Sequence, residues 1–422
     1  MTLSDRRLAW AWLAVVSVAL AIVVIITTPW DWLPGGSLAP IDQTGGLPSA
    51  TLERIDSYRD QIVPVGLAST GVSLVVAIVL GLTPWGARLV RRLPGSRWWP
   101  LQVPLAVAAL LAVGRIVTLP LAIRAQSVQK DFDLATNSWP EWATDLLTSW
   151  AVSVVFAAVP IVVVIAMARR WRRWWLPASL TAGGLVIVGS FGYPLVVEPL
   201  FNNFEEMPDG PLRTSLIQLA ESDGIHVDDV LVADASRRTN SLNAYVSGFG
   251  ATKRIVVYDT LLRDATPDEV RLVVAHELGH AKNDDVLYGT LVGALGAIAG
   301  VTLLALLVTS RRLADRAGYP AGPPRDARVV PAIMALVACG TFLISPVQNL
   351  LSRAIEARAD VHSLDLTHDP ETFEATQRRL ATANLSDPWP PRLLYAWYAS
   401  HPTLAQRIAI AQGWQQRESD GG

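Results

Sequence analysis

The sequence is poor in charged residues. Aspartate, glutamate, lysine and arginine make up only 17% of its 422 residues, whereas a soluble domain usually carries about 25%. With 35 basic and 37 acidic residues, the chain has no basic field that would hold nucleic acid. Its one cysteine, Cys339, cannot form a disulfide within the chain. Hydrophobic residues reach 51% and the mean hydropathy is +0.33, which predicts a membrane protein rather than a disordered or fibrous one.

Seven apolar stretches are long enough, at about 20 residues, to cross a bilayer as helices. Tryptophans gather at the ends of several stretches, which is typical of an aromatic belt at a membrane interface. The first stretch follows two arginines, as a signal peptide would, but its apolar run is too long for one. We therefore expect a spanning anchor there. The stretches are Leu8–Thr28, Gly66–Trp85, Leu101–Ala125, Leu147–Ala168, Leu176–Val197, Val286–Thr309 and Val329–Val347.

The polar residues divide the chain into four regions. Five spans occupy 1–197, two more occupy 286–350, and the polar segments 198–285 and 351–422 lie after them. In the polar segments the sequence predicts a helix start at Ser400-His401-Pro402, and also an amphipathic helix and three short strands. These last four elements are expected at Pro211–Gly224, Val230–Ala233, Asn243–Ser247 and Ile255–Tyr258.

The basic residues of the short loops predict the orientation in the membrane. They are concentrated after the second, fourth and sixth spans, which favours a cytoplasmic N-terminus. The same count places the segment 198–285 and the C-terminus outside the cytoplasm.

Residues 276–280 read His-Glu-Leu-Gly-His, and the residues before them predict the helix that carries them. Thr266-Pro267-Asp268-Glu269 is a capping box with proline at the first helical position. Side chains four residues apart share one helix face. His276 and His280 can therefore approach one metal ion at the distance of about 2.0–2.1 Å that zinc requires. Glu277 can reach the remaining coordination position, where water binds.

These residue types suit hydrolysis of a peptide bond. Zinc lowers the pKa of a bound water to about 7. A neighbouring carboxylate, here Glu277, takes the proton as that water attacks a carbonyl, and can pass it to the leaving amine. The pattern predicts a metallopeptidase with one zinc ion per chain.

A third protein ligand is expected further along the chain, because catalytic zinc keeps three protein ligands and one open position. Glu356 and Asp360 are four residues apart on one predicted helix face. Glu356 could bind the metal while Asp360 accepts a hydrogen bond from an imidazole N–H. The spacing fits equally well a solvated acidic face paired with Arg353 and Arg358, so it leaves both possibilities open.

The motifs resemble those of the type I CAAX prenyl proteases, membrane-embedded zinc metalloproteases of the gluzincin group. The resemblance rests first on His-Glu-Leu-Gly-His and on Ser352-Arg353-x-x-Glu356-x-x-Ala359-Asp360, which follows a further hydrophobic span. It implies that Glu277 is the general base. The zinc ligands that it implies are His276, His280 and Glu356.

Three further stretches carry the resemblance, which therefore covers most of the chain. These stretches are Pro199–Phe204, the segment from Asn243 to Leu262, and Ser400-His401-Pro402 with Arg407-Ile408. The resemblance implies that Asn243 and Ala244 bind substrate backbone as a strand would and that His401 lies near the oxyanion. It also implies a mainly α-helical fold, with about seven transmembrane helices around a water-filled chamber and a small α+β gluzincin-like domain.

The sequence also predicts where one arginine and three histidines lie. Arg115 lies in the middle of the third span, where a charge is costly unless it faces water or a partner. It either lines the chamber or pairs with an acid on another span. His226, His362 and His368 are expected on the surface or beside the metal ligands.

The predicted substrate is a peptide or protein, membrane-associated and either lipidated or not. The eukaryotic members of the family cut prenylated proteins from the cytosolic side, whereas the arginine count places the active segments on the opposite side. An alanine-rich composition that favours arginine over lysine is typical of a bacterial plasma-membrane protein, and bacteria generally lack prenylated CAAX substrates. The side of the active site therefore stays open.

Three other functions are compatible with parts of the pattern. An intramembrane site-two protease also uses His-Glu-x-x-His, but buries it in a hydrophobic span, whereas polar residues flank the motif here. A quality-control metalloprotease of the same superfamily would differ only in cutting misfolded membrane proteins broadly. A non-catalytic seven-span protein with structural zinc would have four closed ligand positions and no use for Glu277.

Overall fold

The computed structural model describes residues 2–94, 98–248 and 253–421. Within these residues, seven helices are long and apolar enough to cross a membrane, each overlapping one stretch predicted from the sequence. The expected mainly helical, multi-pass architecture is therefore confirmed. The helices are α1 (Leu3–Thr27), α2 (Ser49–Leu82), α4 (Trp99–Asp131), α5 (Trp139–Arg170), α6 (Trp175–Val196), α10 (Asp285–Val308) and α12 (Val330–Thr367).

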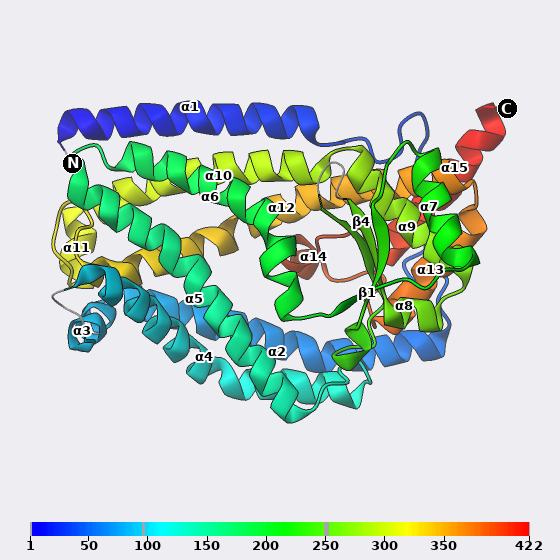
Figure 1. Ribbon diagram of the computed structural model, residues 1–422, viewed down its shortest axis with the longest axis horizontal. Coiled ribbons are helices and arrows are strands. Elements are labelled where there is room, and N and C mark those ends of the chain that lie inside the picture. The colour runs from blue at the N-terminus through cyan, green and yellow to red at the C-terminus, as the bar shows by residue number, and fades with distance from the viewer. Residues whose placement is uncertain (1, 95–97, 249–252, 422) are drawn as a thin grey trace.

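The long helices run along the molecule in two groups (Figure 1). α6 and α1 pack against α10 on one side, and α2 packs against α4 on the other. Two short helices, α3 (Pro84–Arg92) and α11 (Arg311–Ala317), lie at the end opposite the sheet. α12 runs from that end to the sheet, so one continuous helix joins the membrane region to the α+β part.

The spanning helices contact each other along narrow seams. Only 6% of the most apolar part of α2 is buried inside the protein, and the largest share, in α12, is 33%. Large aliphatic side chains such as Val75, Ile116 and Val188 are exposed on the outer surface, where a bilayer would cover them. Cavities occupy the inner side: one of about 370 Å³ lies between α2, α4, α5 and α12, and another of about 810 Å³ lies beside the sheet.

The α+β part is built on a four-stranded sheet of order β1-β2-β4-β3. β2 and β4 are parallel, and the outer strands pair antiparallel to them. The three predicted strands are confirmed within a residue or so, but β1 was not predicted, because its Phe-Glu-Glu sequence lacks an apolar alternation. The strands are β1 (Phe204–Glu206), β2 (Asp229–Ala233), β3 (Ala244–Ser247) and β4 (Arg254–Tyr258).

Two helices bury one face of the sheet. α7 (Pro211–Ser222) matches the predicted amphipathic helix and contributes Leu216 and Leu219 to a core shared with Ile255 of β4 and Val274 of α9 (Pro267–Lys282). α9 begins with the predicted capping box, in which the Thr266 hydroxyl accepts from the Glu269 N–H and the Glu269 carboxylate accepts from the Thr266 N–H. The cap and the core together hold the helix that carries the two histidines.

Four further helices complete this part of the molecule. They are α8 (Asp259–Asp264), which follows β4, and the C-terminal helices α13 (Pro370–Ala383), α14 (Arg392–Tyr398) and α15 (Leu404–Gly421). The predicted helix start at Ser400-His401-Pro402 is wrong, because α15 begins at Leu404. Thr403 and Gln406 form the reciprocal side-chain to backbone hydrogen bonds of a capping box there. His401 therefore lies in the non-helical segment before the helix.

Close contact between α2 and α12 depends on a residue without a side chain. A Cβ atom at Gly81 would overlap Ala335 and the carbonyl oxygen of Pro331. We expect Gly81→Ala to destabilise the protein by about 1–3 kcal/mol through overpacking, measured as a lower thermal unfolding midpoint in detergent. Gly71→Ala on the same helix is the control, because its Cβ would meet no atom within 4 Å. Equal midpoints for the two variants would contradict this packing.

Candidate metal centre

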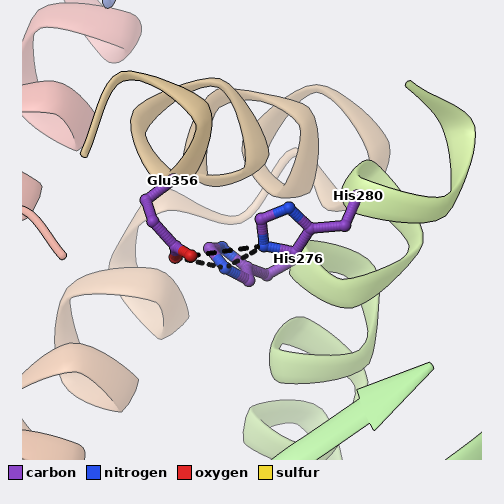
Figure 2. A group of neighbouring side chains, drawn as sticks. All are labelled: His276, His280 and Glu356. Carbon is purple, nitrogen blue, oxygen red and sulfur yellow. Dashed lines mark hydrogen bonds and ion pairs between the residues drawn. The ribbon is translucent and has the colours of Figure 1, made fainter. Parts of the chain in front are cut away.

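Three side chains from two helices converge on one point (Figure 2). His276 and His280 extend from the same face of α9, and Glu356 approaches them from α12. The Nε2 atoms of the two histidines are 3.3 Å apart. The Glu356 carboxylate oxygens lie 3.2 Å from Nε2 of His276 and 3.7 Å from Nε2 of His280. All three ligand atoms lie within 4.8 Å of one another, so one ion could contact all of them.

The outer nitrogen of each imidazole faces a carboxylate. Nδ1 of His276 lies 2.9 Å from Asp360, and Nδ1 of His280 lies 2.9 Å from Asp285. A proton on Nδ1 would face each carboxylate and leave the Nε2 lone pairs pointing at each other and at Glu356. Such an arrangement is repulsive unless a cation or proton lies between them. The donor set therefore fits a zinc ion, which prefers imidazole nitrogen and carboxylate oxygen.

The charge around His276 also favours a cation. Burial by itself would lower the pKa of this imidazole, but the Asp360 and Glu356 carboxylates outweigh it and raise the pKa to about 10. Asp360 is fully buried and Glu356 is 13% exposed. Buried negative charge of this kind needs a positive partner, which a divalent metal ion would supply.

Glu277 and His401 line the 810 Å³ cavity on the open side of this cluster. Burial raises the pKa of the Glu277 carboxyl above its usual range. Nε2 of His401 lies 3.4 Å from Glu356. Arg353 holds the segment before His401 by donating to the carbonyl oxygens of Tyr395 and Ala399, at 3.1 and 2.7 Å. The cavity thus has a carboxylate and an imidazole beside the same three ligand atoms.

The edge strand β3 approaches the same cavity. Ala244 is its first residue, and the exposed Asn243 beside it lines the cavity. β3 pairs with β4 on one side only, and no second strand pairs with it among the described residues. An unpaired strand edge offers N–H and C=O groups to an extended peptide.

Two polar residues of this cluster were given no role from the sequence. Arg407 contacts Glu356 and Asp360, each at 3.3 Å, and donates to Gln377 at 2.9 Å. Asp285 holds His280 and pairs with Arg358. Asp285 lies five residues after His280 in a polar run, and this position could have predicted its contact with the histidine. The only sequence signal for Arg407 was its place in the C-terminal motif.

The residues considered as alternatives lie elsewhere. Neither Arg353 nor Arg358 pairs with Glu356 or Asp360 in the described structure, so the acidic residues do not form a solvated face with them. Of the remaining histidines, His226 and His368 are exposed, whereas His362 pairs with Asp223 at 3.0 Å and lies against Gly279, the residue before His280.

Two family models match the chain. One, described as peptidase family M48, matches residues 206–415. The other, described as CAAX prenyl protease N-terminal, five membrane helices, matches residues 44–203. The first match contains β2, β3, β4, α9 and Glu356, and the second contains α2 to α6. The two matches follow one another along the chain and together cover most of it.

Similar proteins include both bacterial and eukaryotic sequences. An uncharacterized metalloprotease, YhfN, of Bacillus subtilis is 28% identical over 86% of this chain and 85% of its own length. A CAAX prenyl protease 1 homolog of rice is 34% identical over 52% of this chain, and the match spans about half, 51%, of the rice protein. CAAX prenyl protease 1 of Saccharomyces cerevisiae is 26% identical over 71% of this chain and 69% of its own length.

A solved structure shares the fold over nearly the whole chain. The crystal structure of S. mikatae Ste24p superposes with a TM-score of 0.78 and covers 97% of this chain and all of that chain, at 20% sequence identity. The likeness therefore includes the spanning helices as well as the α+β part.

Arg407 offers a test of the charge balance in this cluster. We expect Arg407→Met to destabilise the metal-free protein by about 3–5 kcal/mol, because it removes the guanidinium that contacts both buried carboxylates. The thermal unfolding midpoint in detergent, after chelation, would measure this loss. Arg271→Met is the control, because Arg271 pairs with the exposed Asp268 at 3.7 Å and such surface pairs contribute little. An equal drop in both variants would contradict the role of Arg407.

Proposed function

Because the chain belongs to the CAAX prenyl protease family of peptidase family M48, and is thus a multi-pass membrane metalloprotease, we propose that it is a zinc-dependent endopeptidase. The observation that supports this most strongly is the convergence of His276, His280 and Glu356 beside a cavity that Glu277 lines. We assign the first three residues as the zinc ligands and Glu277 as the general base. Asp360 and Asp285 would orient the two imidazoles by accepting from their Nδ1–H groups.

Glu277 performs the proton transfers in this proposal. Zinc, when bound, polarises the substrate carbonyl and makes water a better nucleophile at neutral pH. The Glu277 carboxylate takes a proton from the attacking water and later gives it to the leaving amine. Burial raises the pKa of this carboxyl, which makes it a stronger base than an exposed glutamate. It must be deprotonated at the start of each cycle.

The substrate would lie between β3 and the segment before α15. Asn243 and Ala244 at the start of β3 would bind the peptide backbone in an extended conformation, as an added strand. His401 would donate a hydrogen bond to the oxyanion of the tetrahedral intermediate, and Arg353 would hold its segment in place. Residues 198–285 and 351–422 thus supply the catalytic groups, while 1–197 and 286–350 supply the membrane region.

The substrate class follows from the setting of this cavity. A peptide or protein at the membrane, with or without a lipid attached, could reach a site that is built on helices continuing from the bilayer. The Bacillus relative, matched along most of both chains, supports a bacterial plasma membrane as the location.

The base assignment predicts the effect of removing one charge. Glu277→Gln keeps the size of the side chain but cannot accept a proton, so we expect kcat to fall by at least roughly 10²–10⁴-fold while zinc stays bound. Peptide hydrolysis by detergent-purified protein would measure kcat, and elemental analysis would measure zinc. Near-normal turnover in this variant would contradict the proposed base.

The same assay identifies the substrate class when it uses a farnesylated CAAX peptide and its unprenylated twin. Cleavage of the farnesylated peptide alone indicates that the protein recognises the farnesyl group of its substrate. Cleavage of both indicates a broader protease of the quality-control type. Cleavage of neither, together with four protein ligands to zinc, would indicate a non-catalytic protein.

The ligand assignment predicts the metal content of single variants. His280→Ala and Glu356→Ala each remove a proposed ligand, and we expect zinc affinity to fall by roughly 100-fold or more. Competition with a zinc chelator of known affinity would measure the change. His362→Ala serves as the matched control, because His362 pairs with Asp223 instead. Unchanged affinity in both ligand variants would contradict the assignment.

A further inference from the structure

A second cavity lies within the membrane region, away from the metal centre. Its volume is about 370 Å³, and α2, α4, α5 and α12 line it. Ala335 of α12 lies on its wall, and Glu356 follows 21 positions later on the same helix. At 1.5 Å per residue, this separation is roughly 32 Å. This part of the cavity wall is therefore far from Glu356, although Val63, which lines the larger cavity, lies only six residues before Ser69 on α2.

The cavity wall carries polar side chains from several of the four helices. On α2 the cavity wall carries Ser69 and Ser73, one helical turn apart, whereas the exposed residues of this region include Val75 and Ile78. On α4 the wall carries Gly114, Arg115 and Thr118, whereas Ile116 and Val117 are exposed. Small and hydroxylated residues and one arginine thus lie on the cavity wall beside aliphatic side chains such as Leu80 and Leu110, so the cavity has a polar part and an apolar part.

The cavity has hydrogen-bond donors but no acidic group. Arg115 and Trp150 both line it. In the described residues the Arg115 guanidinium has neither an ion-pair nor a hydrogen-bond partner, so of the two alternatives the pairing with an acid on another span is not found there. The indole N–H of Trp150 is buried without a hydrogen-bond partner. The hydroxyls of Ser69 and Ser73 likewise make no hydrogen bond in the part that the structure describes.

A guanidinium in the middle of a spanning helix is costly unless it faces water or a partner compensates its charge. Arg115 lies midway between the ends of α4, at the depth where translocation of a charge costs about 2.5–3.5 kcal/mol or more. A buried N–H without a partner adds a further cost of about 1–3 kcal/mol. One negatively charged ligand that accepts several hydrogen bonds would remove both costs.

We propose that this cavity binds an oxyanion, a phosphate or carboxylate group, between the guanidinium of Arg115 and the indole N–H of Trp150. The planar guanidinium matches the two oxygens of such a group and can donate to both. Leu80, Leu110 and Met334 form an apolar part of the same wall. The cavity can thus hold the anionic headgroup of a lipid with the start of its chain, or a free oxyanion with water.

The test uses the full-length protein, purified in a neutral detergent, and two probes. Titration with phosphatidylglycerol against phosphatidylcholine, followed by native mass spectrometry, measures lipid binding. Titration with inorganic phosphate at constant ionic strength, followed by the unfolding midpoint, measures binding of the free anion. Saturable binding of the first probe alone identifies a lipid headgroup, and saturable binding of the second identifies a free oxyanion. Binding of neither probe overturns the proposal.

Three variants locate the binding. We expect Arg115→Gln to weaken binding about tenfold or more, because it removes a charge-assisted hydrogen bond. Trp150→Phe removes only the N–H and should weaken binding severalfold. Arg124→Gln is the charge control on the same helix, because Arg124 already contacts Asp131 and Gln61. Wild-type affinity in Arg115→Gln, or an equal loss in Arg124→Gln, overturns the proposal. If Arg115→Gln does not fold, unchanged affinity in Trp150→Phe overturns it.

Discussion

The balance of charge around Glu356 and Asp360 is the constraint on which the rest of the site depends. These two carboxylates are buried on α12, where unpaired negative charge would be strongly destabilising. Arg407 reaches both of them from α15, and His276 reaches both from α9. Three helices that are far apart in the sequence are thereby held together at one point. A metal ion between the ligand atoms would complete the compensation.

The continuity of α12 connects this charge balance to the membrane. The helix packs against α2 through Gly81 at one end and carries Glu356 near the other. The packing of the spans therefore affects where the carboxylate lies relative to α9, although Pro346 lies between the Gly81 contact and Glu356 and interrupts the hydrogen bonding of α12 there. The site is thus built on α9 and α12, while β3 and the segment containing His401 form its more open side.

Much of the fold could be predicted from the sequence because its signals are local. The seven apolar stretches, the capping box at Thr266 and the amphipathic Pro211–Gly224 helix each depend on residues within a few turns. The errors have local causes too. β1 carries too short a pattern to detect, and Ser400 resembled a helix cap although Thr403 and Gln406 form the actual one.

The sequence by itself determined that His276 and His280 share a helix face, because the α-helical period brings residues four apart together. It also determined that the chain enters a membrane, because its long apolar runs have no other stable environment. Only the tertiary structure decided that Glu356, 80 residues away, meets these histidines, and that Arg407 rather than Arg353 neutralises it. Contacts between distant segments depend on how helices pack, and no local pattern encodes that packing.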